Sequence, residues 1–301
     1  MIAFAQYLVY YTIVVPVLKA SLFTPSLTSF QFFLLVAGTC FIAAGGYSIN
    51  DYFDRGIDES NQKVAAPDVS PAIKRLLYFI LSAIGIAIGC YLTYGLGLRQ
   101  IAFVNAVTVG LLYFYSASYK RLMLIGNFVV AFLTAIAVFL PAFADYELQY
   151  AFRDIHLPAA NNAAYNLKVI IAICFAYALF AFLCTLVREI VKDMEDVEGD
   201  SLAYCKTLPL VAGQKVAARV GQFIILLIIF SIGYVQYSQQ QWENKTTFFY
   251  TTLAIQLPLL FLFGYLFMAK QRSQYKTASL LCKVIMMLGV LSMPVFYYFE
   301  G

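Results

Sequence analysis

Long apolar stretches recur along the whole chain, and short polar segments separate them. Each stretch approaches the roughly 20 apolar residues with which a helix crosses the hydrocarbon core of a bilayer. The apolar runs are continuous and do not alternate with polar residues, which favours helices over the strands of a membrane barrel. The pattern predicts about nine spanning helices, at residues 3–23, 29–50, 76–97, 100–117, 125–144, 168–188, 218–237, 247–268 and 280–299.

The composition agrees with a chain that lies in a lipid bilayer. Of the 301 residues, 62% are hydrophobic and only 12% are charged, and the mean hydropathy is +0.78. These values exclude an ordinary soluble core and leave little chain for a soluble domain. We therefore predict an all-α, polytopic membrane protein that forms a single domain over residues 1–301.

Charge and cysteine usage exclude two further classes. The net charge of +4 is dispersed among loops, so no nucleic-acid partner is indicated. The six cysteines lie mostly inside apolar stretches and form no C-x-x-C pair, and His156 is the single histidine. We interpret the cysteines as core residues and predict no zinc site.

Lysine and arginine side chains are distributed unevenly between the two sides of the predicted bundle. Fourteen of the 20 lie in one set of alternate loops and five in the other, while Lys283 lies inside the last helix. Because cytoplasmic loops retain positive charge, the N-terminus and the loops after the second, fourth, sixth and eighth helices are expected to face the cytoplasm. A prokaryotic cytoplasmic membrane is the expected location, with the active site on its cytoplasmic side.

Carboxylates are concentrated after the second and the sixth predicted helices, in two of these cytoplasmic segments. Eleven of the 16 acidic residues lie there. Three aspartates in each segment share the spacing i, i+3, i+7, namely Asp51, Asp54 and Asp58 in the first and Asp193, Asp196 and Asp200 in the second. On a helix each set occupies one face, where three like charges repel one another. A bound cation is therefore expected to neutralise them.

Magnesium is the cation that fits this ligand set best. The available ligands are carboxylates and the Asn50 amide, without thiolate or imidazole. Magnesium also binds water and substrate phosphates, so the two acidic segments predict a diphosphate held between them. Residues 115–121 end the fourth predicted helix on the same side of the membrane and include Lys120 and Arg121. These two residues would otherwise be typical membrane anchors, but beside the acidic segments we favour a phosphate contact for Lys120.

Together these segments resemble the UbiA superfamily of intramembrane prenyltransferases, which are nine-helix proteins. Residues 50–58 match its first motif, N-D-x-x-D-x-x-x-D, and residues 188–200 look like its second motif in the form R-E-x-x-K-D-x-x-D-x-x-G-D. That longer form is similar to enzymes that make archaeal-type ether lipids and to homogentisate and chlorophyll prenyltransferases, more than to the 4-hydroxybenzoate enzymes. Gly126-Asn127 and residues 206–209 also look familial, so the resemblance covers nearly the whole chain.

The resemblance implies that a polyprenyl group is transferred from an allylic diphosphate to a lipophilic acceptor, with two Mg²⁺ ions bound. The form of the second motif favours geranylgeranylglyceryl phosphate as the acceptor, and an aromatic ring, as in quinone biosynthesis, is the alternative. The expected metal ligands are Asn50, Asp51, Asp54, Asp58, Asp193, Asp196 and Asp200. Asp54, Asp58, Asp196 and Asp200 are the expected catalytic residues, and the expected diphosphate contacts are Arg55, Tyr115, Lys120, Arg121 and Arg188.

The chain departs from the family pattern at two places. The family usually has a basic residue and an asparagine before or within its first helix, whereas Met1 already lies inside an apolar run. We hypothesise that Met1 is an internal start. The family also tends to have an Arg-Pro element after the first motif, which residues 61–67 lack, so acceptor contacts are not carried over to that loop.

Two other membrane-protein classes fit the pattern less well. An ion-coupled transporter would place acidic residues near the middle of its spans, whereas here they lie at the ends. A CDP-alcohol phosphotransferase would carry the signature D-G-x-x-A-R, which is missing from this sequence.

Overall fold

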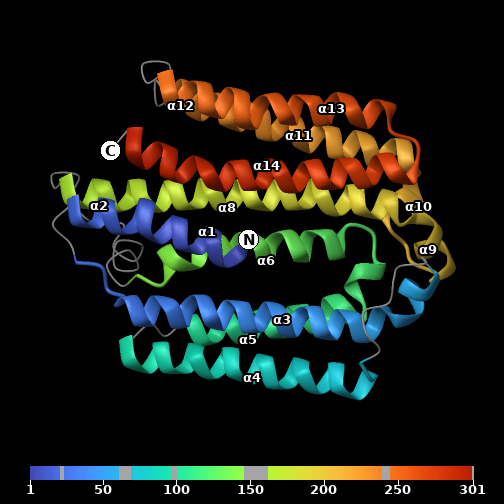
Figure 1. Ribbon diagram of the computed structural model, residues 1–301, viewed down its shortest axis with the longest axis horizontal. Helices are drawn as coiled ribbons and strands as arrows, with labels where there is room; N and C mark the ends of the chain where they lie inside the picture. Colours follow the sequence, from blue (N-terminus) through green and yellow to red (C-terminus); the bar gives the residue numbers. More distant parts are fainter. Residues whose placement is uncertain (21–23, 61–68, 97–99, 146–161, 239–244, 300–301) are drawn as a thin grey trace. The chain divides into compact units, whose positions relative to one another are not determined.

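The computed structural model describes the chain apart from residues 21–23, 61–68, 97–99, 146–161, 239–244 and 300–301. The side chains of residues 55–60, 96 and 162–167 also lie outside the described part, although their backbone is helical. Within the described ranges the chain is helical and forms no strand (Figure 1). Among the described residues, nine helices are long and apolar enough to cross a membrane, as the hydropathy pattern predicts.

The spanning helices start and end as follows in the described residues. The first span is built from α1 (Ile2–Leu8), a π-helical segment (Val9–Val14) and α2 (Val15–Ala20). The next five are α3 (Ser29–Ser60), α4 (Pro71–Leu96), α5 (Gln100–Ala117), α6 (Ile125–Phe143) and α8 (Asn162–Glu195). The last three are α11 (Gln214–Ser238), then α12 (Lys245–Tyr250) continuing through a π-helical segment (Thr251–Gln256) into α13 (Leu257–Met268), and finally α14 (Arg272–Phe299).

Several helices extend beyond the predicted spans, most at the end of α3, at both ends of α8 and at the start of α14. Helix α3 continues ten residues past the expected end and α8 continues seven, so that the charged residues of both acidic motifs lie partly within the last turns of these helices. Hydropathy detects only the part of a helix that matches the apolar core, whereas the backbone hydrogen bonds continue into water. The first acidic motif is consequently helical over its whole length.

The chain divides into two compact units. The first contains residues 1–55, 64–117 and 135–178, and the second contains residues 56–63, 118–134 and 179–301. We describe each unit separately, and the single domain expected over residues 1–301 stays a prediction.

In the first unit, close helix packing and buried polar contacts hold α3 in place. Helices α4 and α5 run side by side (Figure 1). A Cβ atom on Gly85 of α4 would lie 2.4 Å from a side-chain carbon of Ile42, so glycine is what permits α3 and α4 to approach so closely. The Gln6 amide nitrogen donates to the Thr39 hydroxyl at 3.2 Å and to the Ala137 carbonyl at 2.9 Å. These bonds connect the first helix to α3 and α6.

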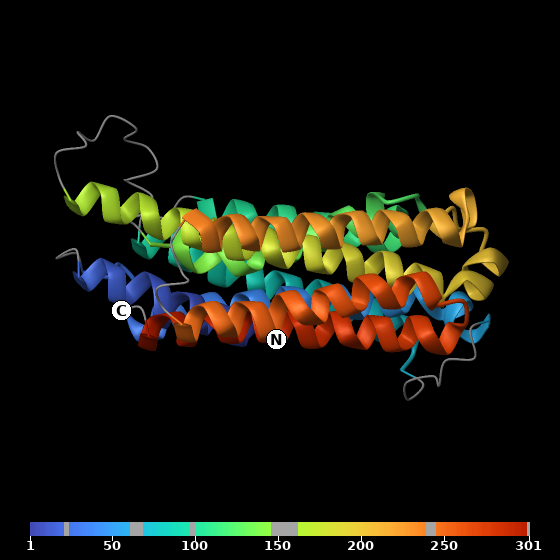
Figure 2. The ribbon, with the colours of Figure 1, turned by 90° about the horizontal axis from the view of Figure 1, so that it is seen from above.

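In the second unit, α11, α13 and α14 lie side by side (Figures 1 and 2). A hydrophobic core formed with α8 includes Ile190, Val191 and Met194 of that helix, all of them almost fully buried. Glu189 and Asp193 each directly precede one of these apolar residues, so they point in a different direction from α8. Burial of the apolar face therefore sets the rotation of α8 and fixes the directions in which its acidic residues point.

Candidate active site

The first acidic motif lies near the end of α3, and its residues up to Arg55 belong to the first unit. The Asn50 amide nitrogen donates a hydrogen bond of 2.5 Å to the Asp54 carboxylate, one helical turn away. Both side chains are half-buried, whereas Asp51 is exposed. The Ser48 hydroxyl donates to the Lys74 carbonyl at 2.8 Å and so connects this part of α3 to the start of α4. The side chains of Arg55 and Asp58 lie outside the described residues.

The second acidic motif lies where α8 ends and the short helix α9 (Val197–Leu202) begins, in the second unit. Asp196 stands between the two helices with φ −95° and ψ 9°, so the three aspartates do not occupy one uninterrupted helix. The helical hydrogen bonds nevertheless continue, because the Asp196 N–H donates to the Lys192 carbonyl and the Asp200 N–H donates to the Asp196 carbonyl, each at 3.0 Å. The helical hydrogen-bond pattern therefore continues from one aspartate to the next across a local bend at Asp196.

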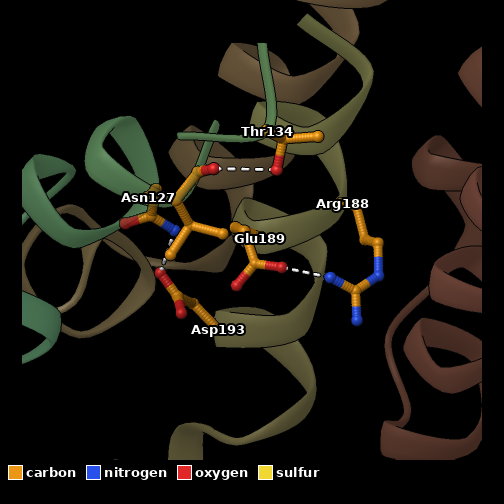
Figure 3. A network of polar contacts seen from close by, with 6 residues as sticks. Asn127, Thr134, Arg188, Glu189 and Asp193 are labelled. Atoms are coloured by element: carbon orange, nitrogen blue, oxygen red, sulfur yellow. Dashed lines mark hydrogen bonds and ion pairs between the residues drawn. The ribbon is translucent and has the colours of Figure 1, made fainter. Parts of the chain in front are cut away.

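Three charged residues of α8 make polar contacts here (Figure 3). The amide nitrogen of Asn127 in α6 donates to the Asp193 carboxylate at 2.8 Å. Glu189, one turn before Asp193, forms an ion pair with the Arg188 guanidinium. Arg188 and Asp193 are five positions apart, which corresponds to about 140° around a helix. The structure therefore directs Arg188 away from the Asn127–Asp193 pair.

Asp196 is buried, with 8% of its surface exposed. Its carboxylate lies 4.0 Å from the guanidinium of Arg272, the first residue of α14. The sequence indicated Arg272 only as one of the positive residues in the cytoplasmic loops. Only the packing of α14 within the second unit brings Arg272 to the acidic motif.

Lys120 and Arg121 lie in the short 3₁₀ helix at Tyr119–Arg121, and the chain around them is held by backbone contacts. The N–H of Lys206 donates to the Arg121 carbonyl at 2.8 Å, which connects this segment to the chain after α9. The Lys120 ammonium nitrogen is buried. The pKa of Lys120 is lowered to about 8, mainly by burial and in part by the neighbouring charges of Arg121 and Lys192, whereas Cys205 and Asp200 oppose the shift. A buried ammonium group beside the second motif is suited to binding an anion.

Gly126 packs against the backbone of Tyr119–Arg121, the lysine segment. A Cβ atom at Gly126 would lie 2.7 Å from the Lys120 Cα and 2.9 Å from the Tyr119 carbonyl oxygen. Both contacts are with backbone atoms, so a side chain at this position would displace the segment that carries Lys120.

We expect Gly126→Ala to destabilise the protein by about 1–3 kcal/mol, the usual effect of overpacking. Prenyl transfer should fall as well, because the lysine segment moves. Gly264→Ala in α13 is the matched control, since a Cβ atom there would have no neighbour within 4 Å. Thermal unfolding in detergent and transfer rates would test this, and equal behaviour of the two variants would contradict it.

The structure thus brings part of the predicted site together within each unit. The second unit contains Lys120, Arg121, Arg188, Asp193, Asp196 and Asp200, and the first contains Asn50, Asp51, Asp54 and the half-buried Tyr115 of α5. Among the described residues, no three histidine, cysteine or acidic side chains are arranged to hold a metal by themselves. The donors that are present are carboxylate and amide oxygens, a set that fits Mg²⁺. The approach of the two motifs to each other stays a prediction.

Comparisons with known proteins give consistent matches. The profile of the UbiA prenyltransferase family matches residues 9–291. Digeranylgeranylglyceryl phosphate synthase of Sulfolobus acidocaldarius is 32% identical over 200 residues, which are 66% of this chain and 64% of that protein. The synthase of the same name from Methanopyrus kandleri is 34% identical over 192 residues, which are 62% of this chain and 60% of that protein. The matched part of the chain thus spans about three fifths of the length of these curated relatives.

Two solved structures share the fold. A structure described as digeranylgeranylglyceryl phosphate synthase in membranes superposes with a TM-score of 0.61 at 20% identity, covering 98% of this chain and 97% of the other. A UbiA homologue from Aeropyrum pernix superposes with a TM-score of 0.67 at 14% identity and the same coverage. At these identities the likeness shows the helical fold.

Proposed function

Because the chain belongs to the UbiA prenyltransferase family, we propose that it is a Mg²⁺-dependent intramembrane prenyltransferase. It transfers a polyprenyl group from an allylic diphosphate to a lipophilic acceptor. One observation carries this proposal most directly: the second unit places the buried Lys120 ammonium within electrostatic reach of Asp200, beside Lys192 and the acidic motif. Carboxylates that suit a metal and a cation that suits phosphate therefore lie together.

The proposed ligands of Mg²⁺ are Asn50, Asp51, Asp54 and Asp58 from the first motif and Asp193, Asp196 and Asp200 from the second. Bound there, the metal would supply the positive charge that stabilises a leaving diphosphate. Asp54, Asp58, Asp196 and Asp200 are the proposed catalytic members of this set. Lys120 and Arg121 contact the phosphate oxygens, and Arg55, Tyr115 and Arg188 complete the proposed diphosphate contacts.

The proposed reaction breaks the bond between C1 of the prenyl chain and the diphosphate oxygen, which keeps the electron pair. An acceptor hydroxyl then forms a bond to C1 and loses its proton, so that the products are a prenyl ether, diphosphate and a proton. Aromatic faces stabilise the positive charge that develops on the prenyl chain. The rings of Tyr52 and Phe53 lie edge to face at 5.0 Å next to Asp54 in the first unit and are suited to this role.

The proposed acceptor is geranylgeranylglyceryl phosphate, a phosphoglycerol ether. Two observations support it: the R-E-x-x-K-D form of the second motif in residues 188–193, and the similarity to two archaeal proteins named digeranylgeranylglyceryl phosphate synthase. An aromatic acceptor is the outcome that would redirect the proposal.

The protein is an integral membrane protein, as its apolar spanning helices and its family indicate. We propose the prokaryotic cytoplasmic membrane as its location, with the active site at the cytoplasmic side. The uneven distribution of lysine and arginine between the loops supports this orientation.

Transfer by the purified, detergent-solubilised chain tests the proposal. With labelled geranylgeranyl diphosphate, Mg²⁺ and geranylgeranylglyceryl phosphate, we expect a labelled diether product; it should disappear on chelation with EDTA and return when Mg²⁺ is restored. Aromatic acids serve as competing acceptors. An exclusively aromatic product would replace the proposed acceptor, and an absence of transfer to every acceptor would contradict the proposed function.

A further inference from the structure

The two acidic motifs share a structural feature: in each, an asparagine amide donates to one aspartate. In the first motif the donor is Asn50, one turn before Asp54 on the same helix. In the second, the donor is Asn127, which lies 66 residues before Asp193 and on a different helix. The hydrogen bonds measure 2.5 Å and 2.8 Å. The amide nitrogen must face the carboxylate in both cases, because an ionised carboxylate only accepts hydrogen bonds.

The second motif needs a donor from elsewhere because its own helix provides none. The residue one turn before Asp193 is Glu189, a carboxylate where the first motif has an amide. Glu189 is buried and forms an ion pair with Arg188 (Figure 3), and as a carboxylate it accepts hydrogen bonds and offers Asp193 no donor. A donor for Asp193 therefore has to come from another helix, and α6 supplies it.

The position of Asn127 is fixed by its surroundings. It is buried in the first turn of α6 and directly follows Gly126, which is in close contact with the backbone of the lysine segment. Its hydrogen bond uses one oxygen of Asp193, Oδ2, and the carboxylate cannot then rotate freely. The remaining oxygen is directed by this bond.

We propose that Asn127 is a positioning residue that orients the Asp193 carboxylate for Mg²⁺, as Asn50 orients Asp54. This inference rests on the proposed function for the identity of the metal. Groups that hydrogen-bond a metal ligand fix its orientation, and their loss typically weakens metal binding by about 10- to 100-fold. Asn127 thus connects the segment that carries Lys120 to the acidic motif through two consecutive residues, Gly126 and Asn127.

Metal binding by the full chain in detergent tests the role of Asn127 without requiring transfer. Mn²⁺ serves as the probe, titrated alone and with inorganic diphosphate, and the free ion is followed by electron paramagnetic resonance. We expect Asn127→Ala to raise the Mn²⁺ dissociation constant about tenfold. Asn127→Ser, which retains a donor, should lie between this variant and the unsubstituted protein.

Thr134→Val is the matched control on the same helix. The Thr134 hydroxyl donates to the Val130 carbonyl of its own helix at 2.9 Å, so its loss removes no bond to α8 (Figure 3). This variant should bind Mn²⁺ as the unsubstituted protein does. Thermal unfolding of the metal-free variants then separates an effect on folding from an effect on metal binding.

In the transfer assay, Asn127→Ala should raise the apparent KM for Mg²⁺ about tenfold and change kcat at saturating Mg²⁺ by less than about threefold. An unchanged Mn²⁺ affinity with only a lower unfolding temperature would overturn the inference, since the bond would then serve only to join α6 and α8. A loss of kcat that Mg²⁺ does not restore would overturn it too. If the unsubstituted protein binds Mn²⁺ and inorganic diphosphate but transfers no prenyl group, the proposed function fails while the role of Asn127 is still tested.

Discussion

Asp54→Asn and Asp196→Asn are each expected to reduce Mg²⁺-dependent prenyl transfer by about 100- to 1,000-fold. Asparagine has nearly the same shape as aspartate, so the main change is the loss of one negative charge from each proposed metal site. Mg²⁺ strongly prefers charged oxygen ligands, and the leaving diphosphate would lose the positive charge that the metal supplies. The two substitutions test one motif each, in separate units of the protein.

Asp196 offers the sharper comparison because a second acidic residue lies two positions away. Asp196 is buried, whereas Glu198 is exposed in the first turn of α9. Glu198→Gln removes the same charge from the same segment and should retain transfer within about twofold, as a surface substitution does. Circular dichroism and size-exclusion profiles would confirm that all variants fold. Full activity of both aspartate variants would exclude the proposed metal ligands.

Lys120→Met is the second substitution for which we expect a large effect, a loss of about 100-fold in transfer. Methionine retains most of the apolar stem and removes the ammonium group, which is buried next to Arg121, Lys192 and Asp200. The proposed contact to the phosphate oxygens would be lost with this charge. Lys120→Arg should restore only part of the activity, because a planar guanidinium does not occupy the space of a compact ammonium.

The control for Lys120 is Lys215, which is exposed at the start of α11 in the same unit. Lys215→Met changes the net charge equally and should leave transfer unchanged within about twofold. Inhibition of the reaction by inorganic diphosphate gives the direct measurement, and Lys120→Met should weaken this inhibition in proportion to its loss of activity. If diphosphate inhibits the Lys120→Met variant as strongly as the unsubstituted protein, Lys120 does not contact the phosphates.

The spanning helices were predictable from the sequence because a lipid bilayer requires long apolar segments. A segment of about 20 apolar residues satisfies its backbone hydrogen bonds as a helix wherever it packs. For the same reason the ends were predicted less well. The residues of α3 after Asn50 and of α8 after Arg188 include many charged side chains, and hydropathy does not distinguish a helix that continues into water from a loop.

The acidic motifs were also predictable, because their residues are close in the sequence and share a helical spacing. The contacts that orient these acids were not. Asn127 reaches Asp193 from 66 residues away, and Arg272 reaches Asp196 from the start of another helix. In the sequence, Gly126-Asn127 is only a dipeptide that resembles the family pattern, and nothing in its spacing indicates that Asn127 contacts Asp193.

For Arg188 too, the motif identifies the residue, whereas helix packing determines its partner. Its place in the motif predicts a diphosphate contact, which stays a prediction. Its ion pair with Glu189 and its direction away from the Asn127–Asp193 pair follow from the packing of α8. Residue type and spacing specify which chemical groups a helix carries, because they depend on neighbours along the chain. The rotation of each helix, and with it the partner of each charged group, follows from packing between helices that are distant in the sequence.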